Sequence, residues 1–464
     1  MEPPRAPQVV RAAALPAGTP EVPVAIVGAG ACGLTAALML RDAGLECVLL
    51  ERDAQPQGST ALSSGFIPAA GTAVQRAAGV DDDTPARFAA DIQAKAKGTA
   101  AAHLVAAYSE AIAPALDALQ ARHGLAFELL DGFLYPGHTQ RRMHTLAQKT
   151  GAALMAALTE AAERAGAMLL TRARVVELWV REDGAEPPTV IGVGYERPDG
   201  SLEHLACQVL LLGCNGFGGN RARVRELLPE MREAEFGGHA GNDGSAIDWG
   251  CALGAALADL GGYQGHGSWA VPQGALITWA LMAEGGVQVN ARGERFHDET
   301  LGYSEASVQV LAQPGGRAWN VFDERLLALG RRFPDFVGAE AAGAVRHAAD
   351  VPALARVIGC DAHTLARTLE GTRLVAPLCA IQVTGALFHT QGGLDIDAHA
   401  RVRRADGRVF PNLLAAGGAA RGVSGNAVWG YLSGNGLLSA VAGGYIAAHT
   451  AARQLAHPAA QESR

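Results

Sequence analysis

The feature that most constrains the fold is a strand, glycine turn, helix and second strand near the N-terminus. The β-branched run Val22–Val27 is followed at once by Gly28-Ala29-Gly30-Ala31-Cys32-Gly33 and by an Ala- and Leu-rich stretch to about Ala43. A second predicted strand, Glu46 to Leu50, ends in Glu51. This order predicts a Rossmann-like βαβ unit that binds a dinucleotide.

Each glycine of this turn has a physical task. Gly28 permits the tight turn, Gly30 lets a pyrophosphate approach the backbone, and Gly33 lets the helix lie close to the sheet. The start of the helix offers free N–H groups to phosphate, and Glu51 is placed to accept hydrogen bonds from a ribose diol. The first part of the predicted cofactor site comprises Gly28, Ala29, Gly30, Cys32, Gly33, Glu51 and Arg52.

A hydroxyl-rich loop indicates FAD rather than NAD. Gly58-Ser59-Thr60 and Ser63-Ser64-Gly65 closely follow the acidic residue, and their N–H and hydroxyl donors suit a flavin's pyrophosphate and ribitol. Two later apolar runs also end in glycine turns and predict strands that deliver those turns to one long cofactor. The expected cofactor contacts in these segments are Ser59, Thr60, Ser64, Gly65, Gly213, Cys214, Gly216, Asn220, Gly417 and Gly418.

Composition narrows the ligand class and the compartment. The 464 residues are 49% hydrophobic with a net charge of −8 and no Lys/Arg stripe, so nucleic acid is not expected as a partner. The seven cysteines lack CxxC or CxxCH spacing, which signals no metal site, and are expected to be buried thiols in a reducing compartment. No apolar run reaches the roughly 18–20 residues of a membrane helix, and the N-terminus lacks signal-peptide features. We expect a cytoplasmic protein without a membrane partner.

Taken in order, these segments resemble the fumarate reductase/succinate dehydrogenase flavoprotein superfamily, which includes 3-ketosteroid Δ1-dehydrogenases and tricarballylate dehydrogenases. The resemblance runs from about Val22 to about Ala448. Its most specific pieces are Val289 to Glu299, similar to the family's "VNxxGxRFxxE" hairpin, and His389 to Leu394, similar to its "HTMGG" turn. Asn242-Asp243-Gly244 is similar to the "GDG" segment beside the flavin. The expected cofactor contacts also include Val175, Asp243, His389, Gly436, Leu437 and Leu438.

The resemblance implies an α/β fold with a Rossmann-like FAD-binding domain of the glutathione-reductase type, interrupted by a smaller α+β capping domain. The active site is expected between the two, because a mobile cap can exclude water and then reopen to release product. The expected layout is a disordered tail over residues 1–20, the FAD-binding domain over 21–265 and 379–450, the capping domain over 266–378 and a C-terminal tail over 451–464.

Two departures from the family pattern bear on the substrate. Fumarate reductases use an arginine in the cap as proton donor and a second arginine in the C-terminal glycine-rich segment to hold a carboxylate. Met282 stands at the first position here, and Val428 lies near the second. Methionine neither donates a proton nor pairs with a carboxylate, so fumarate and succinate are poor substrate candidates.

The ketosteroid dehydrogenase branch fits better at two tyrosines. Tyr303 follows Glu299 by the spacing of that branch's catalytic base, and Gly430 to Gly436, which contains Tyr431, resembles its ketone-polarising segment. The latter is closer still to the tricarballylate dehydrogenase version. The resemblance implies that Tyr303 removes the α-hydrogen, while Tyr431 with the N–H of Gly434 or Gly436 stabilises the enolate and flavin N5 accepts the β-hydride.

Three further residues carry open alternatives. His389, also a catalytic candidate, and His266 match substrate-binding histidines of fumarate reductases, but each is equally compatible with a structural role in a glycine-rich turn. Arg421 can attract a substrate carboxylate or pair with an acid at the surface.

The sequence therefore predicts an FAD-dependent enzyme that acts on CH–CH bonds, by α,β-desaturation of a cyclic or otherwise activated ketone. The first alternative is a reductase or dehydrogenase of an unsaturated or polycarboxylic acid, and the second is a cofactor-bound partner or assembly protein without turnover. A small-molecule substrate and an external electron donor or acceptor are expected, because only one dinucleotide fingerprint is evident. No histidine precedes His103, so the FAD is expected to be non-covalent.

Overall fold

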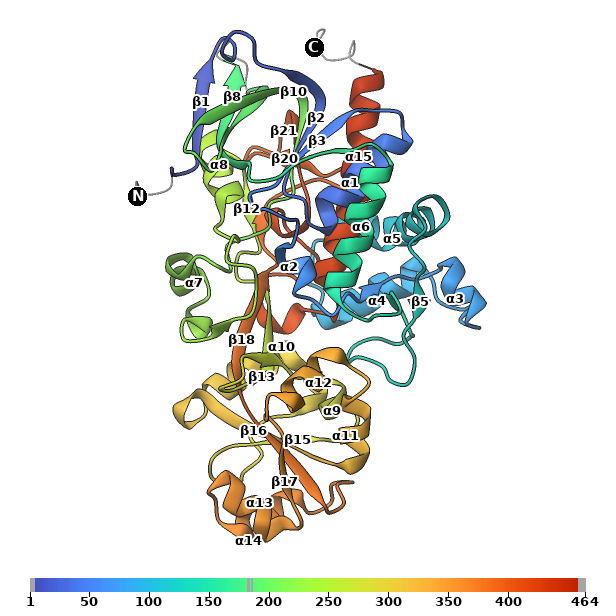
Figure 1. Cartoon of the computed structure of the whole chain (residues 1–464), viewed down its shortest axis with the longest axis vertical. Helices are drawn as coiled ribbons and strands as arrows, with labels where there is room; N and C mark the ends of the chain where they lie inside the picture. Colours follow the sequence, from blue (N-terminus) through green and yellow to red (C-terminus); the bar gives the residue numbers. More distant parts are fainter. Residues whose placement is uncertain (1–4, 182–183, 185–186, 458–464) are drawn as a thin grey trace.

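The computed structural model describes residues 5–181, 184 and 187–457, and its larger part is built on a nine-stranded sheet (Figure 1). Five strands form a parallel layer in the order β7-β3-β2-β10-β21, and β10 continues into an antiparallel meander with β9 and β8. The strands are β1 (Gln8–Ala12), β2 (Glu21–Val27), β3 (Cys47–Leu50), β7 (Met168–Leu170), β8 (Arg174–Arg181), β9 (Val190–Glu196), β10 (Leu202–Leu212), β20 (Arg401–Arg403) and β21 (Val409–Ala415).

The first β-branched run of the sequence lies at the centre of this layer. Within β2, Ile26 is completely buried and pairs with Leu49 of β3 on one side and Leu211 of β10 on the other. A strand covered on both faces needs apolar residues at every position rather than at alternate ones, and the end of β2 meets this need.

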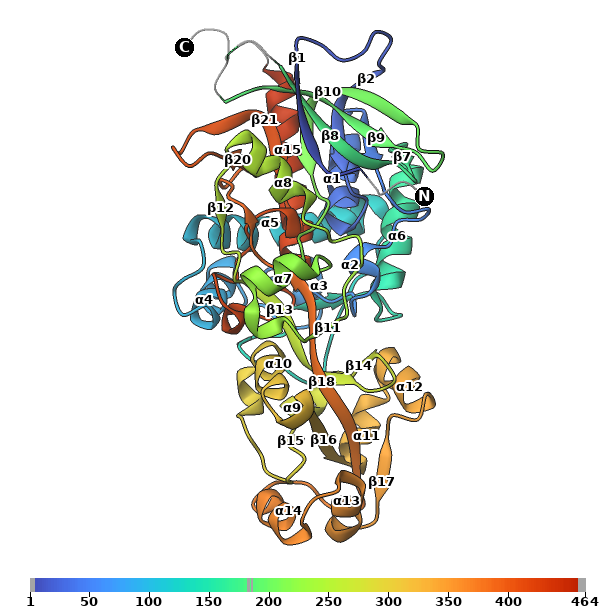
Figure 2. The same ribbon diagram turned by 90° about the vertical axis from the view of Figure 1, so that its left-hand side faces the viewer.

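Long helices cover the parallel layer on one side (Figures 1 and 2). They are α1 (Ala31–Asp42), α5 (Ala102–His123), α6 (Gly151–Arg164) and α15 (Asn435–Ala456). α1 and α15 approach so closely that a Cβ on Gly444 would lie 2.4 Å from the carbonyl oxygen of Cys32. The N-terminal and C-terminal parts of the chain therefore join in one hydrophobic core.

Smaller elements surround this core. A three-stranded sheet and two helices form a lobe beside α5, and several short elements follow the parallel strands. These are β4 (Ile67–Pro68), β5 (Glu128–Leu129), β6 (Met143–Thr145), α3 (Ala73–Ala77), α4 (Pro85–Lys95), α2 (Gly58–Ala61), α7 (Arg221–Leu227), α8 (Ser245–Leu253), β12 (Leu257–Ala258) and β19 (Gly393–Leu394).

A second, seven-stranded sheet forms the other end of the molecule, with the order β14-β13-β18-β16-β15 and with β11 and β17 also paired to β18. Its strands are β11 (Glu235–Phe236), β13 (Tyr263–Ala270), β14 (Ala275–Leu276), β15 (Val287–Val289), β16 (Arg317–Asp323), β17 (Arg346–Ala348) and β18 (Leu378–Thr390). Its helices are α9 (Ala280–Ala283), α10 (Tyr303–Leu311), α11 (Glu324–Gly330), α12 (Pro334–Ala341), α13 (Val351–Ile358) and α14 (Ala362–Leu369).

The antiparallel strands β13 and β18 connect the two ends of the molecule. Both cross the boundaries predicted for the capping domain at residues 266 and 378, and β18 runs from the smaller end into the larger one (Figure 1). We refer to residues 266–378, together with the start of β18, as the cap.

The structure corrects the expectation of a disordered N-terminal tail and of a C-terminal tail that begins at residue 451. Residues 8–12 form β1, which pairs in parallel with β8 and places Val9 against the core, so sheet pairing outweighs the Ala- and Pro-rich composition. At the other end α15 continues to Ala456, because Thr450 and Ala451 are buried against the core. Residues 1–4 and 458–464 of the two predicted tails lie outside the described part of the chain.

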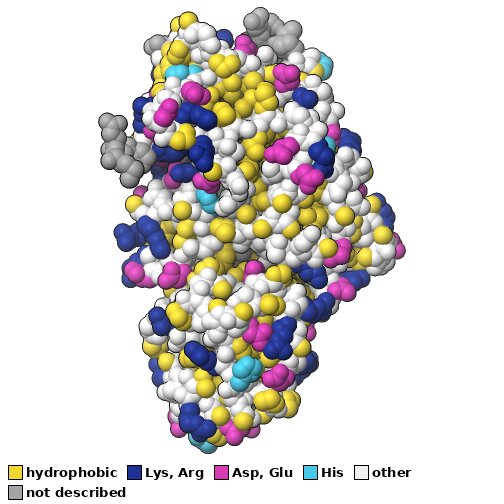
Figure 3. Space-filling view, viewed as in Figure 1, with side chains coloured by type: hydrophobic (Ala, Val, Ile, Leu, Met, Phe, Trp, Pro, Cys, Tyr) yellow, Lys and Arg dark blue, Asp and Glu magenta, His cyan; other side chains and the backbone are white. Residues whose placement is uncertain are grey.

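All seven cysteines are free, but only four of them are buried. Cys251 is exposed, which corrects the expectation that every thiol would be inside. On the face seen in Figure 3, Lys and Arg side chains are mixed with Asp and Glu. Among the described helices, none combines the length and the apolar character needed to span a bilayer.

Candidate active site

A first cavity lies where the parallel strands end. Because the carboxyl ends of parallel strands meet at one edge, the turns after β2, β3, β10 and β21 come together there. Most of the residues predicted for the cofactor line it. They are Gly28, Gly30, Cys32, Glu51, Arg52, Ser59, Thr60, Val175, Gly213, Cys214, Asp243, Gly417 and Gly418.

The glycines of the first turn serve different physical needs. Gly28 has a φ of +98°, and a Cβ there would lie 2.7 Å from the carbonyl oxygen of Gly213. A Cβ on Gly33 would lie 2.0 Å from the carbonyl oxygen of Gly28, so this glycine is required for α1 to approach β2. At Gly30, by contrast, a Cβ would meet only the Thr60 hydroxyl, at 3.6 Å. The protein's own atoms therefore do not explain the glycine at position 30.

Charged pairs flank the first cavity. Arg52 donates to the carbonyl oxygen of Gly241 at 2.7 Å and pairs with Asp243 at 3.1 Å. His239 lies 2.8 Å from Asp53. The Glu51 carboxylate accepts N–H groups of Ala29 and Asp53, each at 2.9 Å, so it holds the turn as well as facing the cavity.

A second cavity opens between the first cavity and the cap. The two cavities share Ser59, Thr60, Asn215, Gly418 and Ala440, so they adjoin. Further predicted residues line only the second one. They are Ser64, His266, Tyr303, His389, Tyr431, Gly434, Gly436 and Leu437.

Two tyrosines and a serine gather in the second cavity. Tyr303 is the first residue of α10, and Tyr431 and Ser433 precede α15, with the two tyrosine ring centroids 6.1 Å apart. Burial raises the pKa of Tyr303 above its usual range, and hydrogen bonds with Ser433 and Tyr431 oppose that rise. Burial and the neighbouring Tyr303 raise the pKa of Tyr431 as well.

The N–H of Gly436 donates to the Tyr431 hydroxyl at 3.3 Å. The role of the Gly434 or Gly436 N–H at the substrate oxygen stays a prediction. In the structure the Gly436 N–H orients the Tyr431 hydroxyl, which also lies 3.5 Å from Nε2 of His389.

Both histidines of the second cavity are neutral at physiological pH. His266 stacks on Tyr303 with ring centroids 4.7 Å apart, and its Nδ1 accepts the N–H of Ser268. Burial lowers the pKa of His266 to about 3 and that of His389 to about 4. Among the described residues that line this cavity there is no Arg, Lys, Asp or Glu.

A family model described as FAD binding domain matches residues 23–437. The chain belongs to this FAD-binding domain family.

The relatives are reductases and dehydrogenases. The chain is similar to "Fumarate reductase (cytochrome)" of Shewanella frigidimarina, with 27% identity over 93% of this chain and 77% of the relative. Two solved ketosteroid dehydrogenases share the fold. The 3-ketosteroid-Δ4-(5α)-dehydrogenase from Rhodococcus jostii RHA1 has a TM-score of 0.73 at 24% identity, with coverage of 93% of this chain and 97% of that one. The 3-ketosteroid Δ1-dehydrogenase from Sterolibacterium denitrificans has a TM-score of 0.78 at 19% identity, with coverage of 94% and 100%.

The chain is therefore an FAD-dependent oxidoreductase of the fumarate reductase family that acts on CH–CH bonds, which confirms the predicted superfamily, fold class and cofactor. The first cavity fits FAD. Its turns present backbone N–H groups, and the open space in front of Gly30 is what a pyrophosphate needs.

Some predicted FAD contacts lie behind the cavity walls rather than in them. Asn220 caps α7 through its side chain and donates to the carbonyl oxygen of Asp243, so it holds the wall from outside. Gly33 serves the contact between α1 and β2. The predicted contacts that do not line either cavity are Ala29, Gly33, Gly65, Gly216, Asn220 and Leu438.

Of the two alternatives for Arg421, the structure shows the pairing with acidic residues. Its guanidinium lies 2.6 Å from Asp259 and 3.4 Å from Asp395, and it lines neither cavity. Met282 is buried in the core of the cap and does not line the second cavity.

Sequence reasoning missed several residues of the second cavity. Tyr135 comes from an irregular loop between β5 and β6, and its ring centroid lies 6.4 Å from that of Tyr303. Phe66, Trp279 and Phe388 supply apolar walls from three other segments. None of these aromatic residues stands in a motif. Ser433, by contrast, could have been predicted, because it lies two positions after Tyr431 in the same glycine-rich segment.

A buried ion-pair cluster lies behind the second cavity. Arg142 and Asp83 are completely buried at their side chains and pair at 2.8 Å, and Arg142 also pairs with Asp91. Beside them, Nε2 of His138 lies 3.0 Å from the carbonyl oxygen of Ser433. The cluster thus supports the segment that carries Tyr431 and Ser433.

Proposed function

We propose that this enzyme desaturates a neutral, cyclic ketone at its α,β bond. The observation that carries the proposal is the second cavity, which is lined by aromatic, aliphatic and hydroxyl-bearing side chains, Tyr303, Tyr431 and Ser433 among them, but by no charged side chain among the described residues. A carboxylate substrate would have to leave water without a cationic partner, which is costly. A ketone needs only hydrogen-bond donors at its oxygen.

The first cavity is proposed to hold the nucleotide half of FAD, with Gly28 and Gly30 at the pyrophosphate and Glu51 at the ribose. The residues shared by the two cavities, such as Ser59 and Gly418, lie where the cofactor would pass from one to the other. When bound there, FAD supplies the acceptor for a hydride from the substrate's β-carbon.

The hydroxyl groups have complementary roles in this proposal. Tyr431 donates to the ketone oxygen, and the Gly436 N–H holds its hydroxyl in place. Tyr303 takes the proton from the α-carbon as a phenolate and becomes the neutral phenol, and the Ser433 hydroxyl lowers the cost of forming that phenolate. Stabilising the enolate oxygen with one oriented donor is worth roughly 3 kcal/mol in comparable sites.

The size and shape of the walls favour a rigid ring substrate. Phe66, Trp279, Phe388 and Leu276 give flat apolar surfaces around the hydroxyl groups. The solved relatives of the same fold act on 3-ketosteroids by their names, which supports testing that class first. An external electron acceptor would complete turnover, and a cytoplasmic location stays a prediction.

The rival is a reductase of an unsaturated acid, favoured by the similarity to fumarate reductase. Anaerobic titration of the yellow protein with saturated cyclic ketones, ketosteroids and carboxylic acids distinguishes the two. Bleaching of the flavin band by a ketone supports the dehydrogenase. If only chemically reduced protein reacts, and only with an unsaturated acid, the ketone proposal is wrong.

A further inference from the structure

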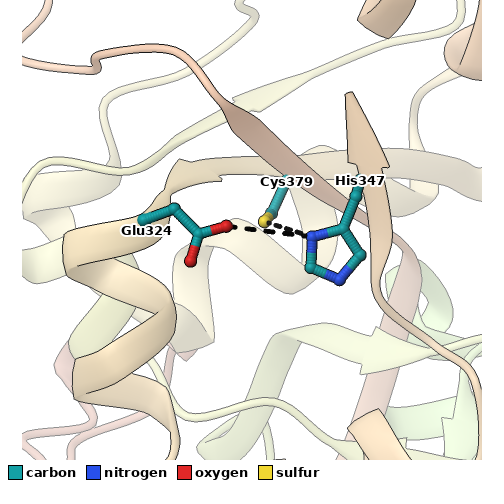
Figure 4. Close-up of side chains that lie close together, drawn as sticks. All are labelled: Glu324, His347 and Cys379. Carbon is teal, nitrogen blue, oxygen red and sulfur yellow. Dashed lines mark hydrogen bonds and ion pairs between the residues drawn. The ribbon is translucent and has the colours of Figure 1, made fainter. Parts of the chain in front are cut away.

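Away from both cavities, three side chains with metal-binding atoms converge in the cap (Figure 4). Glu324 is the first residue of α11, His347 is the middle residue of β17, and Cys379 lies near the start of β18. The antiparallel register places His347 directly opposite Cys379. Figure 4 shows that the Glu324 carboxylate and the Cys379 thiol both point toward the same ring nitrogen of His347.

The distances in this cluster are close to those of a metal site. The Cys379 Sγ lies 3.4 Å from His347 Nδ1, which lies 3.9 Å from Glu324 Oε1, and all three ligand atoms fall within 4.8 Å of one another. With Zn–S of about 2.3 Å and Zn–N or Zn–O of about 2.1 Å in a tetrahedral site, ligand atoms stand roughly 3.4–3.6 Å apart. A small rotation of the exposed Glu324 side chain closes the longer gap.

The charges around the cluster suit a cation. The carboxylates of Glu324, Glu340 and Asp323 and the guanidinium of Arg331 act electrostatically on Cys379, and the Arg331 guanidinium is paired with Glu340 at 2.7 Å. A divalent cation would offset this excess of negative charge.

We propose that Glu324, His347 and Cys379 bind one divalent transition metal ion, with Zn²⁺ the best match. One thiolate, one imidazole and one carboxylate form a ligand set that this ion accepts in tetrahedral sites, with the fourth position left to water. The exposed fractions of Glu324 and His347 are 53% and 58%, so the ion can enter from solvent, while Cys379 is completely buried.

The bound ion would fasten β17 to its neighbours. β17 has three residues, pairs with β18 and buries Ala348 in a small hydrophobic cluster, so the ion would add a second attachment for this short strand. Cys379 and His389 lie near opposite ends of β18, roughly 30 Å apart at about 3.3 Å per residue. The metal therefore stabilises the cap without entering the chemistry of the second cavity.

The test uses chelator-treated protein that retains its FAD. Titration with Co²⁺ should give one equivalent of a complex whose absorption lies at longer wavelength than the flavin bands and includes thiolate ligation. Zn²⁺ should displace it and raise the midpoint of thermal unfolding. Because the thiol and the imidazole must lose protons, the affinity should rise from pH 6 to pH 8.

Substitutions in the cluster test which side chains bind the ion. Cys379→Ser and His347→Ala should each weaken Zn²⁺ binding by at least roughly 100-fold, since even the outer partners of metal ligands are worth 10–100-fold. Cys360→Ser, at another cap cysteine outside the cluster, should bind as the wild type does, and retained FAD shows that each variant is folded. Absence of a one-equivalent complex in the wild type, or unchanged binding in Cys379→Ser and His347→Ala, would overturn the proposal.

Discussion

The two adjoining cavities are built in different ways. The first is walled largely by backbone, where turns after four parallel strands meet and glycines leave room for a ligand. The second is walled by side chains from segments far apart in the sequence, including Phe66, Tyr135, His266, Tyr303 and Tyr431. A backbone wall tolerates many sequences but excludes an added Cβ at close contacts such as Gly28, while a side-chain wall changes its chemistry with single substitutions. This difference explains how one FAD site can serve reductases and dehydrogenases with different substrates.

The largest effect is expected in the backbone wall. Gly33→Ala places a Cβ 2.0 Å from the carbonyl oxygen of Gly28, so α1 must move away from β2. We expect a loss of about 3 kcal/mol or more in the free energy of unfolding, measured by denaturant titration.

The matched variant is Gly30→Ala, whose Cβ has room in the protein. The apoprotein should unfold like the wild type, but FAD affinity should fall, as measured by flavin fluorescence. Equal destabilisation by both variants would show that the space at Gly30 is not reserved for a ligand.

A large effect is also expected behind the side-chain wall. Arg142→Leu leaves Asp83 and Asp91 without their cationic partner in a buried site, which costs about 3–5 kcal/mol. Thermal unfolding and FAD content measure the loss. Arg164→Leu is the control, because its pair with Glu160 is exposed and is worth about 0–1 kcal/mol.

The same cluster predicts a sensitivity to acid. Burial alone would raise the pKa of Asp91, but hydrogen bonds from Arg142 and Thr139 outweigh it and leave the pKa below the ordinary value of 3.8. This contribution to stability is therefore complete above pH 3.8 and is lost as the pH falls through the lowered value. Urea midpoints between pH 2 and pH 6 should decline more in the wild type than in Asp91→Asn.

In the second cavity, a substitution is expected to lower the reaction rate rather than the stability of the protein. Tyr303→Phe keeps the ring stacked on His266 but removes the hydroxyl, so kcat/KM for a reactive ketone should fall on the order of 10²–10³-fold with FAD retained. Tyr445→Phe, on α15 outside both cavities, is the control. A Tyr303→Phe enzyme with full activity would remove this residue from the proposed mechanism.

The pH dependence tests the same residue. Because the pKa of Tyr303 is raised, its base form grows with pH, and kcat/KM should climb through pH 6 to 9 without a plateau. His266 and His389, with pKa values lowered to about 3 and about 4, should add no inflection in that range. An inflection near pH 6.5 that disappears in His389→Gln would contradict the neutral state assigned to that histidine.

The smallest effect on substrate is expected at Arg421. Its guanidinium is engaged by Asp259 and Asp395 outside the cavities, so Arg421→Ala should leave KM for a neutral ketone within about twofold, although stability falls by about 1–3 kcal/mol as two carboxylates lose their partner. A large rise in KM for a carboxylic acid substrate would instead favour the rival function.

The sequence by itself determined the βαβ unit, the FAD cofactor and the superfamily, because the residues from Gly28 to Glu51 act through local backbone geometry that neighbouring positions encode. It also indicated Tyr303 and Tyr431, which stand at recognisable spacings. Only the tertiary structure showed that Arg421 is paired away from the site, that Tyr135 reaches Tyr303, and that Glu324, His347 and Cys379 meet. These relations depend on contacts between segments from different parts of the chain, and such contacts leave no periodicity or spacing in the sequence.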